Sequence, residues 1–124
     1  MIRVTYPHMR EELVDYLVGL SDLDYQRRVW IDAGSQKTVV YDNFDLAVHF
    51  LFDDTALASD PYSTIGKILQ DASEARAIAV LKSCLDDLFN QYGLTLSDAE
   101  YIALPEWRTV IAAAEAALVA MSER

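Results

Sequence analysis

The chain has 124 residues, with 20 Asp and Glu against 10 Lys and Arg, and so carries a net charge of −10. More than half of it (52%) is hydrophobic and it has only 4 Gly and 3 Pro, a composition that excludes a disordered or collagen-like chain. A single Cys excludes a disulfide framework and a Cys-based zinc site. The length predicts one globular domain spanning residues 1–124.

The first predicted helix runs from Pro7 to Leu20, because Pro suits a first helical turn and one apolar stripe follows it. The members of that stripe are Leu13, Tyr16, Leu17 and Leu20. The segment 22–41 is ambiguous, since its β-rich runs flank a turn that contains Gly34. We expect a short helix or irregular segment here, followed by at most a small β-hairpin near residues 28–41.

The second predicted helix spans Asn43–Phe52, with Asp42 as its N-cap. Its predicted buried face consists of Phe44, Ala47, Val48, Leu51 and Phe52. The opposite face carries Asp45, His49 and Asp53 at successive turns. After it, Asp60-Pro61 predicts an N-cap and the first position of a short helix that reaches about Leu69, with Gly66 as a weak point.

The longest predicted helix begins after Asp71 and ends near Tyr92, before Gly93. Its apolar seam consists of Ile78, Leu81, Leu85, Leu88 and Tyr92. A Ser97-x-x-Glu100 capping box predicts a short helix to about Leu104. A last helix, from Trp107 to Met121, has an apolar stripe on one side and alanines on the other. The expected fold is therefore mainly α, a compact bundle of about five or six helices.

The surplus negative charge lies in two windows that contain no Lys or Arg. The first window, residues 38–66, has five acidic residues, and the second, residues 83–107, also has five. The rest of the chain is balanced, so the two windows carry the whole net charge. If they adjoin, they form a negative surface that repels nucleic acid and anionic lipid and attracts basic partners.

His49 is the residue with the most chemical possibilities. Asp45 and Asp53 lie one helical turn on either side, so both carboxylates would raise its imidazole pKa. The three side chains also offer one nitrogen and two oxygens to a divalent metal, or a general base held by a carboxylate. A solvated helix face with i,i+4 ion pairs explains the same spacing.

Other residues point away from catalysis. Cys84 falls between two seam positions, which predicts a buried, unreactive thiol. The four glycines are isolated, so no phosphate-binding loop and no cofactor are indicated.

The doublet Arg27-Arg28 is too little for nucleic-acid binding in so acidic a chain. No apolar run approaches about 18 residues and no leader is recognisable, so we expect neither membrane insertion nor secretion.

Several strings together resemble a family of small, acidic, uncharacterised bacterial proteins of about this length. They are Tyr6-Pro7-His8-Met9-Arg10, Leu20-Ser21-Asp22, Tyr25-Gln26-Arg27-Arg28-Val29-Trp30, Ala47-Val48-His49-Phe50-Leu51-Phe52-Asp53-Asp54-Thr55 and Asp60-Pro61 through Ile65-Gly66. The resemblance covers nearly the whole chain and implies a bacterial cytoplasmic protein, without an activity. In size and charge alone, the chain is also similar to bacterial immunity proteins that neutralise basic toxins.

Three functions remain open from the sequence. The first is an acidic protein-binding module, of immunity or inhibitor type, for a basic protein partner such as a toxin. Its candidate contact residues are Tyr41, Asp42, Asp45, Asp53, Asp54, Asp60, Tyr62, Asp86 and Asp87. The second is a metal site or enzyme built on Asp45, His49 and Asp53. The third is a homo-oligomeric structural protein that uses the Ala-rich side of the last helix.

Overall fold

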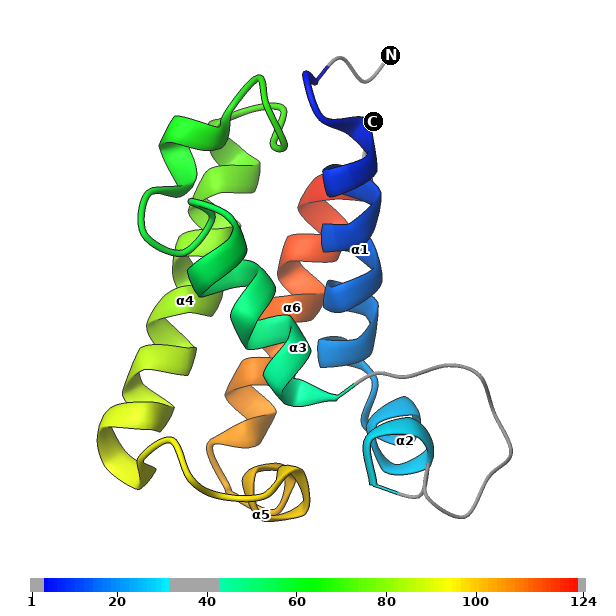
Figure 1. The fold of residues 1–124 in the computed structure, drawn as a ribbon, viewed down its shortest axis with the longest axis vertical. Helices are drawn as coiled ribbons and strands as arrows, with labels where there is room; N and C mark the ends of the chain where they lie inside the picture. The colour runs from blue at the N-terminus through cyan, green and yellow to red at the C-terminus, as the bar shows by residue number, and fades with distance from the viewer. Residues whose placement is uncertain (1–3, 32–42, 123–124) are drawn as a thin grey trace.

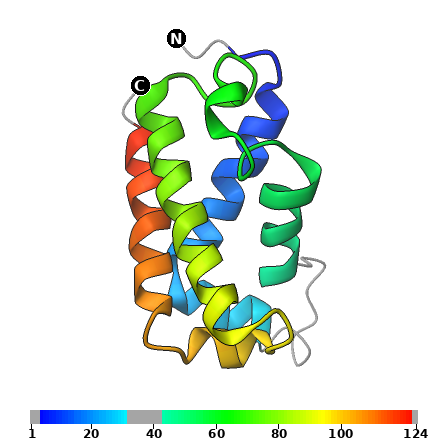
Figure 2. The same ribbon diagram turned by 90° about the vertical axis from the view of Figure 1, so that its left-hand side faces the viewer.

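The computed structural model describes residues 4–31 and 43–122, and the helices in these ranges form a bundle (Figures 1 and 2). In Figure 1, α1 and α4 run downward and α3 and α6 run upward. The long elements are α1 (Pro7–Ser21), α3 (Phe44–His49) with its π-helical continuation η3 (Phe50–Asp54), α4 (Ala72–Tyr92) and α6 (Trp107–Ser122). The short elements are α2 (Leu23–Tyr25), η1 (Gln26–Ile31), η4 (Pro61–Thr64) and α5 (Asp98–Ile102). No β-strand occurs in residues 4–31 or 43–122, so the expected mainly α bundle is confirmed.

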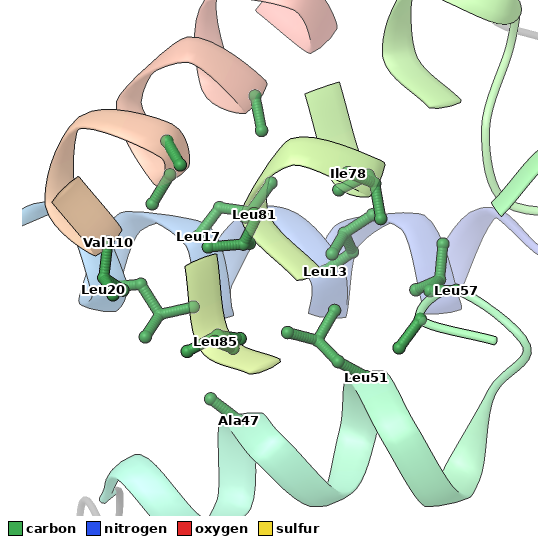
Figure 3. Packing of buried hydrophobic residues seen from close by; sticks show 14 of the residues in the cluster. Leu13, Leu17, Leu20, Ala47, Leu51, Leu57, Ile78, Leu81, Leu85 and Val110 are labelled. Carbon is green, nitrogen blue, oxygen red and sulfur yellow. The ribbon is translucent and has the colours of Figure 1, made fainter. Parts of the chain in front are cut away.

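One continuous cluster of buried side chains fills the space between the long helices (Figure 3). Helix α6 packs most extensively on α4 and α1, as Figure 1 shows. The predicted stripes supply this core: Leu13, Leu17 and Leu20 from α1, and Ile78, Leu81, Leu85 and Leu88 from α4. Each such side chain contributes about 1.5–3 kcal/mol through its burial. The apolar spacing therefore correctly predicted which of these α1 and α4 side chains are buried.

The alanines of α6 divide between the interior and the surface. Ala113, Ala114 and Ala117 are buried in contacts within this chain, whereas Ala112 and Ala116 are exposed. Small side chains allow neighbouring helices to approach closely. Of the predicted Ala-rich side, Ala113 and Ala117 are used inside the bundle and Ala112 and Ala116 are exposed, so homo-oligomerisation stays a prediction.

Two local expectations differ from the structure, and the short helix favoured for the start of the segment 22–41 is confirmed. Asn43, not Asp42, is the N-cap of α3, because its side chain accepts a hydrogen bond from the Leu46 amide at 2.9 Å. The helix predicted to reach Leu69 is only the short 3₁₀ helix η4, because Gly66 takes a φ of +87° that no helix continues. In the segment of the optional hairpin, residues 26–31 are π-helical. Positions 32–42, with Tyr41 and Asp42, lie outside the described residues.

The buried face of the α3–η3 segment also differs from the expected one. Phe50 is buried at 3% exposure, whereas the predicted core residue Phe52 is only half-buried. The cause is the wider π turn from Phe50 to Asp54, which changes the angular spacing of side chains relative to an α-helix. Phe52 is thereby placed at the edge of the core, next to solvent.

A buried ion pair joins α1 to α4. Both guanidinium nitrogens of Arg10 donate to the two carboxylate oxygens of Glu74, at 2.8 and 2.9 Å. The side chains are 6% and 0% exposed. Arg10 also donates to the Ile68 carbonyl at 3.0 Å, and Glu74 accepts from the Gln70 amide at 2.7 Å. Burial alone would raise the pKa of Glu74, but these hydrogen bonds and the guanidinium charge outweigh it and lower the pKa.

A buried amide organises the other end of the bundle. The Gln26 side chain is fully buried and donates to the carbonyls of Gly19 and Leu20 at 2.8 and 3.0 Å. Its oxygen accepts the indole N–H of Trp107 at 2.9 Å. Because the last carbonyls of a helix have no partner within the helix, Gln26 caps α1 and attaches it to α6 at the same time.

We expect removal of either partner of the buried ion pair to destabilise the protein strongly. Arg10→Ala or Glu74→Ala should lower the free energy of unfolding by about 3–5 kcal/mol, because one buried charge is left uncompensated. The matched control is the half-exposed surface pair Lys82–Asp86, at 2.7 Å, where Asp86→Asn should cost less than about 1 kcal/mol. Urea unfolding measures both. Equal losses at the two pairs would contradict this assignment.

The lowered pKa of Glu74 also predicts acid sensitivity. A carboxyl whose pKa is lower in the folded than in the unfolded state contributes stability above its unfolded value of 4.5, and this stability is lost as the pH falls through the folded pKa. The free energy of unfolding should therefore decrease as the pH is lowered below about 4.5. In Glu74→Gln the decrease should be shallower. Urea unfolding at a series of pH values measures the free energy of unfolding of wild type and of Glu74→Gln. If both decrease equally as the pH falls, this role of Glu74 is refuted.

Candidate functional site

A groove of about 450 Å³ lies between α3–η3, the end of α4 and the segment that leads into α5. Its floor is apolar and consists of buried or half-buried side chains: Phe44, Val48, Phe52, Phe89, Leu96 and Tyr101. Its rim carries Asp45, His49, Asp53, Asp98 and the strongly exposed Leu94. The volume falls in the range of ligand-binding clefts, and an apolar floor with a charged rim is typical of a recognition site.

Aromatic packing holds the floor in place. The Phe44 ring lies 5.2 Å from Tyr101, 6.0 Å from Phe89 and 5.0 Å from Trp107, measured between ring centroids. Phe52 meets Phe89 at 6.4 Å. Most of these pairs are edge-to-face or tilted, which is the favoured arrangement of aromatic rings. These ring contacts join the floor on α3–η3, α4 and α5 to one another and to Trp107 of α6.

The two acidic windows meet at this groove. Asp98, from the second window, accepts a hydrogen bond from the backbone amide of Phe44, in the first window, at 3.2 Å. That amide belongs to the first turn of α3, where a carboxylate is favoured by the helix dipole. The capping box of Ser97 and Glu100, which is present as expected, fixes the start of α5 and so places Asp98.

His49 sits between two carboxylates on the groove rim. Its Nδ1 lies 2.6 Å from Asp53 and its Nε2 lies 3.4 Å from Asp45, and all three side chains are exposed. The hydrogen bond with Asp53 raises the imidazole pKa above 6.5, and the charge of Asp45 adds to this effect. The predicted juxtaposition of the three residues on one exposed face is therefore confirmed.

This geometry favours an ion-paired imidazolium. The two ring nitrogens point in different directions and each faces a different carboxylate, so the carboxylates do not converge on one point. Within the described ranges, no group of three or more His, Cys, Asp or Glu residues is arranged to hold a metal ion. A raised pKa also favours the protonated form of the ring, whereas a general base acts in its neutral form. Catalysis at His49 stays an untested prediction.

The other predicted contact residues are dispersed. Asp54 follows Asp53 and is exposed. Asp60 caps η4, and Tyr62 within η4 is 50% exposed. This element lies toward the other end of α4 (Figure 1). Asp86 pairs with Lys82, and Asp87 is exposed one position further along α4. The structure therefore brings Asp45 and Asp53 together at the groove, and leaves Asp60 and Tyr62 outside it.

Several groove residues were absent from the sequence-based site. Asp98, Phe89 and Leu94 line the groove. In the sequence, Asp98 belongs only to the second acidic window, and Phe89 and Leu94 belong to none of the predicted patterns. The signal available was the capping box, which marks the residue after Ser97 as a helix start. Cys84 is half-buried, and burial raises its thiol pKa, which agrees with an unreactive thiol.

Comparison with known proteins identifies the family. Residues 4–124 match the model of a Domain of unknown function (DUF7945), and the chain belongs to this family. The match covers almost the whole chain, as the resemblance to an uncharacterised family implied. No curated protein and no solved structure matches the chain. Among the helices that the structure describes, none has the length and apolar character needed to cross a membrane.

The ion pairs of His49 predict a titration that NMR can follow. The His49 pKa should lie above 6.5, and Asp53→Asn should lower it more than Asp45→Asn, because the hydrogen bond to Asp53 is the larger cause. Asp54→Asn is the matched control and should have the smallest effect, since Asp54 acts only through its charge. An equal response to all three substitutions would show that the 2.6 Å contact does not form in solution.

Proposed function

We propose that this protein is a protein-binding module of inhibitor or immunity type, and that its groove receives a basic segment of a protein partner. The observation that carries the proposal is the convergence of the two acidic windows on one apolar groove, with Asp45 and Asp53 from one window and Asp98 from the other. Charge complementarity selects the partner, because Lys or Arg side chains pair with the rim carboxylates.

The groove fits a segment that is both basic and apolar. Val48, Phe52 and Leu96 offer half-buried contact area, and Leu94 is 73% exposed beside them. An apolar side chain of the partner covers this floor, while flanking cations reach the rim. Interfaces of this kind take most of their affinity from a small central cluster and their association rate from the surrounding charge.

The rest of the chain supports the same kind of partner. The charge outside the two windows sums to zero, so the negative field is concentrated where the windows lie. Concentrated charge raises the association rate with an oppositely charged protein, an effect that salt screens. The proposal includes a toxin as one such basic partner and the bacterial cytoplasm as its setting, as the resemblance to immunity proteins and to a bacterial family implies.

The test compares two variants with the same change in net charge. Asp45→Asn/Asp53→Asn neutralises the groove rim, and Asp15→Asn/Glu115→Gln neutralises two exposed acids outside the windows. The partner is first captured with the wild-type protein and purified. At low salt, the rim variant should associate with it about tenfold more slowly than wild type does. High salt should reduce this difference. The control should associate like wild type.

A third variant separates charge from apolar contact. Leu94→Ser removes the most exposed apolar side chain of the groove without changing charge. It should raise the dissociation rate and leave the salt dependence of association unchanged. Stopped-flow or surface-based kinetics measures both rates. A wild-type association rate that does not depend on salt, or equal slowing in the rim variant and its control, would remove the proposal.

A further inference from the structure

A second pocket, of about 400 Å³, lies at the same end of the bundle as α5 and shares no residue with the groove. Its walls come from α2, η1, the segment between α5 and α6, and the first turns of α6. The apolar walls include Leu23, Leu104, Trp107 and Ile111. Two guanidinium groups, those of Arg27 and Arg108, complete the lining.

These two arginines have no partner in the described part of the chain. Neither guanidinium group forms a hydrogen bond or an ion pair there, although the chain has twice as many acidic as basic residues. The acidic residue closest to Arg108 in sequence, Glu106, binds the Tyr92 hydroxyl with both oxygens, at 2.8 and 2.9 Å. Asp24 precedes Arg27 by three residues, a helical spacing that often gives an ion pair, and forms none with it.

We propose that this pocket binds a small organic anion, with its carboxylate or phosphate oxygens on Arg27 and Arg108 and its apolar body against Leu104, Trp107 and Ile111. The guanidinium fork matches both oxyanions, which it binds through paired, charge-assisted hydrogen bonds. The pocket volume is that of a small-molecule site. Arg108 lies in the first turn of α6, where the helix dipole also favours an anion.

The charged residues that line the pocket are opposite in sign to those on the groove rim. The groove rim carries Asp45, Asp53 and Asp98, whereas the charged residues of the pocket are both arginines. A negatively charged protein repels free anions over most of its surface, so an anion is retained only where unpaired cations gather. The proposed site is independent of the protein partner proposed for the groove.

The experiment titrates four defined compounds into ¹⁵N-labelled protein and follows the amide and indole signals. Benzoate and phenyl phosphate carry both an oxyanion and an apolar body, benzyl alcohol lacks the charge, and inorganic phosphate lacks the body. We expect saturable shifts at Trp107 and Leu104 with phenyl phosphate and benzoate, and much weaker binding of the other two. Small ligands of this size bind in the millimolar range, so titration extends to about 10 mM.

Matched variants locate the binding. Arg27→Gln and Arg108→Gln should each weaken binding about tenfold or more, because each removes charge-assisted hydrogen bonds. Arg28→Gln makes the same charge change one residue away, outside the pocket lining, and should bind like wild type. All three side chains are exposed, so folding is preserved. The proposal would be overturned if neither benzoate nor phenyl phosphate gave saturable shifts. It would also be overturned if Arg28→Gln weakened binding as much as Arg27→Gln and Arg108→Gln.

Discussion

The ion pair between Arg10 and Glu74 sets the position of α1 against α4, and the bundle depends on that register. Leu13, Leu17 and Leu20 follow Arg10 along one face of α1, and the buried seam of α4 follows Glu74 in the same direction. Both seams begin near the joined residues and face the same core (Figure 3), and α6 packs on both α1 and α4 (Figure 1). The pair also binds the backbone of Ile68 and Gln70, so an apolar substitute of equal volume would leave those groups unsatisfied.

At the opposite end of the bundle, Gln26 has the corresponding structural role beside the groove and the second pocket. It attaches the end of α1 to Trp107, and the Trp107 ring packs edge-on against Phe44. Phe44 belongs to the floor of the groove and Trp107 to the wall of the second pocket. The two concave sites therefore share one aromatic cluster, which fixes their separation.

Local patterns in the sequence predicted the helices, but not what joins them. Leu and Ile at helical spacing and the Ser97 box depend on neighbouring residues, so the long helices and the start of α5 were predicted correctly. Arg10 and Glu74 are 64 residues apart and Gln26 and Trp107 are 81 apart, and no periodicity signals such partners. The groove was missed for the same reason, since Asp98 meets Phe44 across 54 residues. The π turn, which buries Phe50, carries no sequence signature.

Charge compensation within the fold differs between the two concave sites. At the groove, Asp45 and Asp53 flank an imidazole whose raised pKa favours the cation, and Asp98 accepts from the first turn of α3. These local interactions reduce the repulsion between gathered carboxylates, so the folded protein holds the groove together before any partner arrives. The basic partner proposed for the groove would compete with the imidazole for these carboxylates, which lowers its net gain in affinity and leaves long-range steering as the main contribution of the charge. Among residues 4–31 and 43–122, Arg27 and Arg108 have no such counter-charge, so the anion proposed for that pocket would meet no competing carboxylate there.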